Sequence, residues 1–325
     1  MAGAVAARPG GAVLVVNPTA SKADPALRAA AVRTLARRAP LEVHATKGPG
    51  DARALAARAV AAGAALVVVL GGDGTVSEVA QAVSGTGVPL VPLPAGSTNV
   101  FARALGWPAA PHAAVGRLGP ALDRCARREL VVGRLIAGPH DRPFVVNAGM
   151  GLDAEVVHAV ESRPALKRLL RQAAFAGATA GAARRLAREA AHIRVSADGG
   201  PERDVVSLVA ACGTPYSYVG PLALDLLPGA AFDGRLRWGG LPRGRLGDLA
   251  AVLAAALRGG GGGPPGLVGG WARRSLLARA DRPVAIQADG EPLGWHADLR
   301  LEPGPRVVVL LPPDASGSPT ETSKS

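Results

Sequence analysis

A glycine-rich segment with one acid and one hydroxyl follows an apolar run early in the chain. Ala65–Leu70 is apolar and mostly β-branched, Gly71–Thr75 reads Gly-Gly-Asp-Gly-Thr, and a helical pattern starts at Val76. This order predicts a strand, a tight loop and a helix start, where free N–H groups and the helix dipole favour an anion. Asp73 would repel a bare phosphate, so the segment predicts a phosphate site that includes Mg²⁺. The alternative is an ordinary strand-to-helix turn.

The loop differs from the two common phosphate-binding motifs. A dinucleotide fingerprint needs a third glycine where this chain has Ser77, and a P-loop needs a Gly-Lys-Ser/Thr tripeptide that the sequence lacks. The segment therefore predicts a phosphate-binding loop of another type.

Two further loops follow apolar runs in the same way. Val88–Pro94 is extended and precedes the turn Ala95–Asn99, and Ala12–Val16 precedes the polar segment Asn17–Lys22. Loops at the carboxyl ends of neighbouring parallel strands form a nucleotide crevice in an open α/β sheet. For the Asn17 loop, a simple turn is the alternative.

These segments resemble the signatures of the diacylglycerol kinase catalytic family, which includes bacterial lipid kinases, sphingosine kinases and ceramide kinases. Ser97 stands where the family usually has Thr, and Val100 where many members have Asp. The resemblance runs from about residue 12 to 310. Its motifs are Asn17-Pro18, Gly71–Glu78, Pro94–Arg103, Asn147–Ala154, Pro228–Leu236 and Gln287–Pro292.

The resemblance implies an ATP-dependent kinase that phosphorylates a lipid hydroxyl, most simply diacylglycerol or a related glycerolipid. Its cofactors would be ATP and Mg²⁺, with Asp73 orienting the catalytic Mg²⁺. The residues expected at the nucleotide are Asn17, Thr46, Gly71, Gly72, Asp73, Gly74, Thr75, Ser97 and Asn99. For Thr46, a helix-entry turn is the alternative.

Two later acid-glycine pairs are candidates for further roles. The segment Asp289-Gly290-Glu291 reads alone as a hairpin turn, whereas the resemblance makes it the site where the acceptor hydroxyl loses its proton. We name Glu291 as the proton acceptor and Asp289 as the alternative. Asp233-Gly234 is a hairpin turn on spacing alone, and the resemblance implies a structural Mg²⁺ there. Its ligands would be Asp233 and the carbonyls of Ala230 and Arg235.

Composition limits the class of protein and its partners. The chain has 325 residues, a formal net charge of +12 and two cysteines, with 3% aromatic residues. The charge favours anionic partners, the cysteines give no disulfide framework, and the scarce aromatics argue against single-stranded nucleic acid. No apolar run is long enough to span a membrane, and the N-terminus reads as a first strand. We expect a cytoplasmic protein, with peripheral attachment to the inner face of the membrane as a further option.

The elements needed to position these residues divide the chain into two parts and a tail. Residues 1–127 alternate strand and helix, which predicts an open parallel-sheet nucleotide-binding domain of the α/β class. Residues 128–312 predict an antiparallel β-rich, β-sandwich-like domain for the lipid acceptor, with helical insertions and a last strand near Arg306–Leu311. Residues 313–325 are polar and are expected to be disordered.

A basic amphipathic stretch lies within the second part. From Arg163 to Arg194 the chain has eight basic residues, with leucines between them, which suits an anionic membrane surface. The alternative is a solvated helix face.

Two other functions are alternatives to a lipid kinase: a nicotinamide nucleotide kinase and a non-catalytic basic protein that binds lipid or nucleic acid. The oligomeric state, a homodimer included, is left open.

Overall fold

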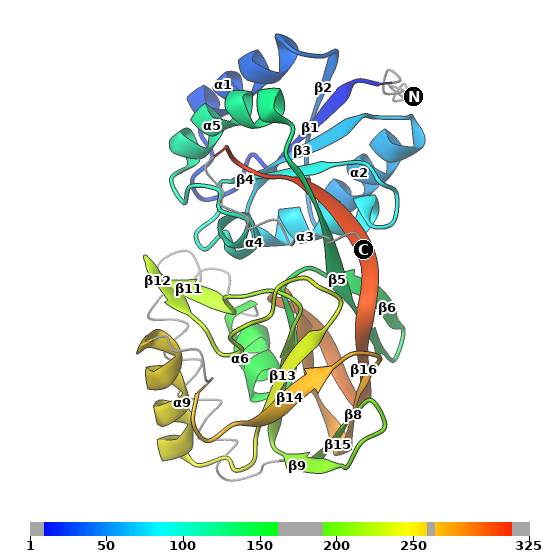
Figure 1. Ribbon diagram of the computed structural model, residues 1–325, viewed down its shortest axis with the longest axis vertical. Helices are drawn as coiled ribbons and strands as arrows, with labels where there is room; N and C mark the ends of the chain where they lie inside the picture. Colours follow the sequence, from blue (N-terminus) through cyan, green and yellow to red (C-terminus); the bar gives the residue numbers. More distant parts are fainter. Residues whose placement is uncertain (1–9, 162–190, 259–263, 314–325) are drawn as a thin grey trace, which may run out of the picture.

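The computed structural model describes residues 10–161, 191–258 and 264–313, which form two lobes stacked along the long axis (Figure 1). The first lobe contains nine elements in chain order. They are β1 (Ala12–Val16), α1 (Pro25–Ala36), β2 (Leu41–Ala45), α2 (Asp51–Ala61), β3 (Leu66–Gly71), α3 (Asp73–Val83), β4 (Leu90–Pro94), α4 (Val100–Ala104) and α5 (Pro111–Arg124).

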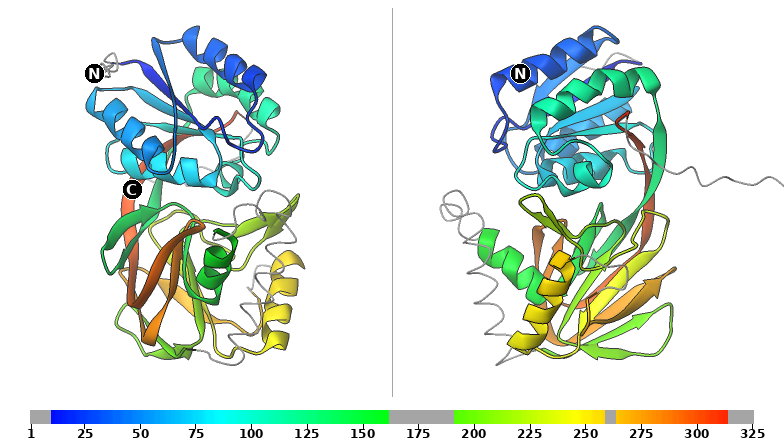
Figure 2. Two further views of the ribbon diagram at one scale, coloured as in Figure 1. Left: turned by 180° about the vertical axis from the view of Figure 1, so that it is seen from behind. Right: turned by 60° about the vertical axis from the view of Figure 1, so that its left-hand side comes forward.

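The strands of the first lobe are parallel and lie in the order β2, β1, β3, β4. The strands β1 and β4 are buried throughout, as expected of parallel strands covered on both faces. The helices α1 and α5 cover one face of the sheet, and α2 and α3 cover the other (Figure 2). The order in which the chain adds strands reverses between β1 and β3, and the loops after these two strands lie at the same edge of the sheet.

The second lobe is built mainly from antiparallel strands around β7, which pairs with β10 on one side and β15 on the other. Its elements are β5 (Arg127–Ala137), β6 (His140–Phe144), β7 (Asn147–Gly151), α6 (Leu152–Glu161), β8 (Ile193–Ala197), β9 (Arg203–Val205), β10 (Ser207–Ala211), β11 (Ser217–Val219), β12 (Leu222–Leu224), β13 (Leu236–Leu241), α9 (Leu246–Arg258), β14 (Val268–Ala272), β15 (Leu276–Ala288) and β16 (Glu291–Leu310).

Two long strands connect the lobes. The strands β5 and β16 pair antiparallel from Leu310↔Arg127 to Arg300↔Ile136, and they run from the upper into the lower lobe in Figure 1. At its end β16 also joins β4, where Val309 pairs in parallel with Leu90. The end of the described chain therefore returns to the first lobe, and one sheet continues through both.

The expected fold class is confirmed, with a parallel first lobe and an antiparallel second one. The helix α3 begins at Asp73, earlier than Val76, because Gly72 is its extended N-cap and its carbonyl accepts from Val76 N at 3.0 Å. The expected boundaries of the domains stay a prediction. Most of the basic stretch from Arg163 to Arg194 and the tail after 313 lie outside the described residues.

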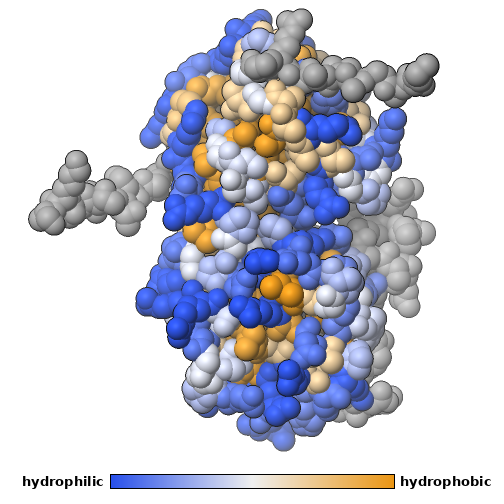
Figure 3. Space-filling view, turned by 90° about the vertical axis from the view of Figure 1, so that its right-hand side faces the viewer, coloured by the Kyte–Doolittle hydropathy of each residue, from blue (hydrophilic) through white to orange (hydrophobic). Residues whose placement is uncertain are grey.

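Within the described part of the chain, no helix combines the length and apolar character needed to cross a bilayer. Figure 3 shows one side of the molecule, on which hydrophobic patches in both lobes are set among hydrophilic residues.

Candidate functional site

The two glycine loops of the first lobe touch backbone to backbone where β3 and β4 end. Gly71 and Pro94 are register partners, so the strands end level with each other. A Cβ added to Gly96 would lie 2.6 Å from Gly72 Cα, and one added to Gly72 would lie 3.3 Å from Gly96 Cα. A side chain on either glycine would push the loops apart, so this close approach requires glycine on both sides.

Asp73 joins the two loops through its side chain. Its Oδ2 accepts a hydrogen bond from Thr98 Oγ1 at 2.8 Å, and its carboxylate also faces the backbone N–H groups of Asn99, Val100 and Phe101 at the start of α4. Burial raises the pKa of Asp73, and these hydrogen bonds act in the opposite direction. Mg²⁺ is commonly held by one or two carboxylates together with substrate phosphates and water, so this half-buried acid fits the expected cation.

Asn17 and Thr75 are in contact where the strand order reverses, between β1 and β3. Asn17 Nδ2 donates to Thr75 Oγ1 at 3.0 Å, which connects the loops that follow these two strands. Ligands of open α/β sheets bind at the point where strand order reverses, as it does here. Gly74 next to them is exposed, and a Cβ added there would meet nothing within 4 Å. The space above this helix start is therefore open to a phosphate.

Three other residues expected at the nucleotide lie in the loops that follow β2 and β4. Thr46 follows β2, and its backbone N–H donates to Val16 O at 2.9 Å. Ser97 is exposed. Asn99 is buried with a φ of 52°, and its amide exchanges hydrogen bonds of 2.8 and 2.9 Å with the backbone of Gly96. The Asn99 side chain therefore shapes the second loop, and direct contact of these three with a nucleotide stays a prediction.

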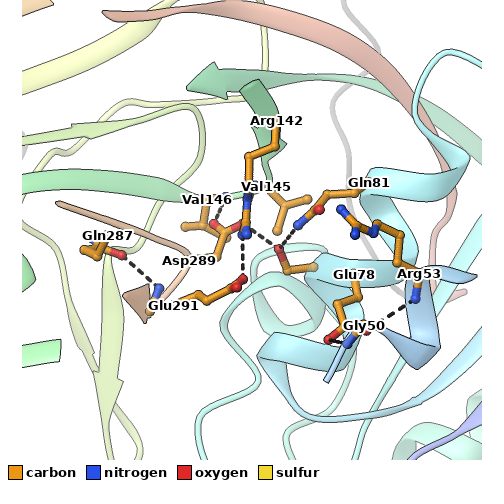
Figure 4. Close-up of polar contacts among 12 residues, drawn as sticks. Gly50, Arg53, Glu78, Gln81, Arg142, Val145, Val146, Gln287, Asp289 and Glu291 are labelled. Carbon is orange, nitrogen blue, oxygen red and sulfur yellow. Dashed lines mark hydrogen bonds and ion pairs between the residues drawn. The ribbon is translucent and has the colours of Figure 1, made fainter. Parts of the chain in front are cut away.

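Glu78 has a role that the sequence analysis did not assign. Its carboxylate accepts hydrogen bonds from Gly50 N at 2.9 Å and Arg53 N at 3.3 Å (Figure 4). Gly50 is the N-cap of α2 and has a φ of 85°. Glu78 thus caps α2 from α3 and holds the loop that carries Thr46. Its place as the last residue of the Gly71–Glu78 motif was the only signal.

Asp289 belongs to the second lobe but contacts helix α3 of the first lobe. Its Oδ2 accepts a hydrogen bond of 2.8 Å from the hydroxyl of Ser77, which lies one turn after Asp73 on α3. Burial raises the pKa of Asp289, although four hydrogen bonds oppose this shift. The donors are Ser77 Oγ and the backbone N–H groups of Val145 at 2.7 Å, Val146 at 2.8 Å and Asn147 at 3.3 Å.

Glu291 lies in a different environment, although only Gly290 separates it from Asp289. Its side chain is 53% exposed, and its Oε2 lies 2.7 Å from Arg142 Nη2 of β6 in an ion pair (Figure 4). Asp289 and Gly290 both have positive φ values, 51° and 79°, and they form the turn between β15 and β16. This segment is therefore a hairpin turn that also presents an acid to the first lobe.

A buried polar network supports this turn from behind. Gln287 Nε2 donates to Asn147 Oδ1 at 3.0 Å and to Asp153 Oδ2 at 2.7 Å, while its Oε1 accepts from Gly290 N at 2.9 Å. Tyr216 donates its hydroxyl to the other oxygen of Asp153. Burial raises the pKa of Asp153 and raises that of Tyr216 well above its usual value. The sequence motifs contain Asn147, Asp153 and Gln287 but not Tyr216, and they gave no sign of the network.

The segment expected to hold a structural Mg²⁺ is closed by an ion pair. Asp233 Oδ2 accepts from Arg235 Nε at 2.9 Å and Nη2 at 2.5 Å, and its Oδ1 accepts from Arg235 N at 3.1 Å. Among the residues that the structure describes, no cluster of three or more His, Cys, Asp or Glu could hold a metal ion. Ala230, the other expected carbonyl ligand, is buried.

Comparison with known structures shows similarity along almost the whole chain. A diacylglycerol kinase from Bacillus anthracis superposes with a TM-score of 0.65 at 19% identity, covering 93% of this chain and 97% of that one. An NAD kinase from Archaeoglobus fulgidus in complex with ATP gives a TM-score of 0.50 at 13% identity, covering 93% and 94%. At these identities, the likeness is one of fold.

Sequence relatives match a shorter part of the chain. A YegS-like lipid kinase of Pseudomonas aeruginosa is 47% identical over 89 residues, which are 27% of this chain and 28% of that protein. A diacylglycerol kinase of Mycobacterium tuberculosis is 52% identical over 58 residues, or 18% and 19% of the two chains. The matched segments thus span less than a third of these relatives.

The family comparison covers the lobe with the glycine loops. Residues 11–126 match the diacylglycerol kinase catalytic domain. These residues include β1, β3 and β4 and the loops that follow them, described above. The resemblance found in the sequence is therefore confirmed, and the first lobe is similar to the diacylglycerol kinase catalytic domain along residues 11–126.

Proposed function

We propose that this protein transfers the terminal phosphate of ATP to the hydroxyl of a lipid, diacylglycerol or a related glycerolipid. The observation that carries the proposal is the 2.8 Å hydrogen bond between Ser77 and Asp289. It holds an acid of the second lobe against the helix whose first turn faces the proposed phosphate site. An acceptor hydroxyl between the lobes would then meet both a proton acceptor and the phosphate to be transferred.

The first lobe supplies the nucleotide site in this proposal. Gly72, Gly74 and Thr75 would lie against the phosphates, where the N-terminus of α3 favours negative charge. Asp73 would hold Mg²⁺, which supplies positive charge against the phosphate oxygens. Catalysis of phosphoryl transfer consists mainly of such positioning and charge stabilisation.

We propose Asp289 rather than Glu291 as the base. Burial raises the pKa of Asp289, and a carboxylate with a raised pKa is the better proton acceptor near neutral pH. Its Oδ2 already accepts a proton-bearing hydroxyl, that of Ser77, from the side of the first lobe. Glu291 is largely exposed and paired with Arg142, so it would act as the partner that fixes this arginine beside the turn.

The partners of the protein follow from the same proposal. A lipid acceptor requires access to a membrane surface, and the net charge of +12 favours an anionic one. We therefore propose peripheral, reversible attachment, with the basic stretch from Arg163 to Arg194 as its sequence candidate.

A nicotinamide nucleotide kinase is the competing function, because the fold is shared with an ATP-bound NAD kinase. The test is to incubate the full chain with labelled ATP, Mg²⁺ and either a short-chain diacylglycerol, sphingosine or NAD. We expect label in phosphatidic acid. Label in NADP, or ATP binding without transfer to any lipid, would refute the proposal.

Two variants test the assignment of the base in the same assay. Asp289→Asn keeps the shape of the side chain and should lower kcat on the order of 10²-fold or more at unchanged ATP affinity. Glu291→Gln breaks the ion pair with Arg142 and should lower kcat less. A larger loss of kcat in Glu291→Gln than in Asp289→Asn would instead assign the role of the base to Glu291.

A further inference from the structure

Arginines contact the loop at Asp233 on more than one side. Between β12 and β13, the Asp233 carboxylate receives three hydrogen bonds from Arg235, two from its guanidinium and one from its backbone N–H. Two residues earlier, Ala231 O accepts from Arg128 Nη2 at 3.0 Å. Both oxygens of the carboxylate and a neighbouring carbonyl are therefore engaged by arginines.

A tryptophan fixes the same guanidinium from another side. Arg235 Cζ lies 4.6 Å from the centre of a Trp271 ring, and Arg237 Cζ lies 5.2 Å from it. Cation–π contacts of this kind favour a planar guanidinium over a hydrated metal ion. Arg235 is thus placed between the carboxylate of Asp233 and the face of Trp271.

A divalent cation fits this donor set poorly. Mg²⁺ needs near-octahedral oxygen ligands at short distance, whereas the Asp233 carboxylate is occupied and three guanidinium groups surround the loop. A cation entering there would have to displace Arg235 from both of its partners and would then be repelled by it and by Arg128 and Arg237.

We propose that the guanidinium of Arg235 takes the place of the structural Mg²⁺ that the family resemblance implied at Asp233. The charge that a metal would supply to this loop comes from the chain itself. The second lobe is then stable without a divalent cation, and any Mg²⁺ requirement of the protein belongs to the nucleotide site. This inference does not depend on the proposed kinase activity.

Thermal unfolding of the nucleotide-free full chain, in EDTA and at increasing MgCl₂, tests the proposal. We expect the Tm of the unmodified protein to be the same in both. Arg235→Gln should lower the Tm in EDTA by about 1–3 °C, since a partly exposed ion pair is lost. Mg²⁺ should restore it, because the Asp233 carboxylate loses its guanidinium partner and becomes free to bind a metal.

Control variants separate the outcomes. Arg28→Gln removes one positive charge from an exposed position on α1 and should leave the Tm unresponsive to Mg²⁺. A Mg²⁺-dependent rise in the unmodified protein that disappears in Asp233→Asn would overturn the proposal, and so would an Arg235→Gln protein that Mg²⁺ does not stabilise. A Mg²⁺-dependent rise in Tm that persists in Asp233→Asn would place the metal at another site and support the proposal.

Discussion

Gly74→Ala separates the proposed phosphate site from the stability of the fold. Gly74 is the second residue of α3, is exposed, and has free space where a Cβ would lie. Its φ is not in the left-handed region, so alanine can adopt the same backbone. The variant should therefore fold normally, and its new methyl group would stand only in the space we assign to the phosphates.

We expect the variant to be more stable than the unmodified protein and to bind ATP more weakly. Alanine is a better helix former than glycine by about 0.5–1 kcal/mol in a helix interior, and a gain of roughly 0.5 kcal/mol would raise the Tm by about 1–2 °C. The methyl group would force the phosphate out of its position. We expect this to weaken the binding free energy of ATP by about 1–3 kcal/mol, the cost of overpacking in a protein core. At 1.4 kcal/mol per tenfold, this weakens ATP binding roughly 5- to 140-fold.

Differential scanning fluorimetry without nucleotide and calorimetric titration with ATP and Mg²⁺ measure the two effects. Gly116→Ala is the matched control, because Gly116 is also exposed, helical and free of neighbours within 4 Å, but lies on α5. It should gain stability and keep full ATP affinity. If Gly74→Ala bound ATP as tightly as this control, the phosphates would not lie over the start of α3.

Four further outcomes follow from the same geometry. Asp73→Ala should fold but lose activity on the order of 10²-fold or more in the lipid kinase assay, and near-native turnover would contradict its role. Glu78→Ala leaves two N–H donors of α2 uncapped and should lower the free energy of unfolding in urea by about 0.5–2 kcal/mol. Gly96→Ala places a Cβ 2.6 Å from the facing backbone and should destabilise the fold by about 1–3 kcal/mol. Because the base must be ionised and burial raises the pKa of Asp289, kcat/KM should rise with pH through a midpoint above 3.8, and Glu291→Gln should keep that rise.

The first lobe could be predicted closely from sequence because its signals are local. The bounds of β1 agree with the expected Ala12–Val16, and β4 lies within the expected extended segment Val88–Pro94, since buried parallel strands are continuous apolar runs between polar loops. The strand β16 could not be predicted in this way. Only its end near Arg306 was expected, because Gly294 and the Pro303–Pro305 segment read as breaks. Pairing with β5 and β15 carries the strand through them, with a register shift after Pro303.

The same distinction holds for the contacts of the candidate site: those within the first lobe could be predicted from sequence, and those between the lobes could not. The contact of Asn17 with Thr75 could be anticipated, because the carboxyl ends of neighbouring parallel strands meet at one edge of a sheet. The hydrogen bond between Ser77 and Asp289 spans 212 residues of sequence and depends on how the lobes pack. The same holds for Arg142, which no motif contains and which the structure places beside Glu291.

The return of β16 to the first lobe bears on how the protein is made. A ribosome completes residues 11–126 long before Val309 exists to pair with Leu90. At 5–20 residues per second, the roughly 180 intervening residues take about 10–40 s. During that time β4 is an open edge, and open apolar edges recruit foreign strands. Pro92 and Pro94 in β4 have no N–H to offer such a strand. Until β16 has been synthesised, the first lobe therefore has an open edge that pairs poorly with foreign strands.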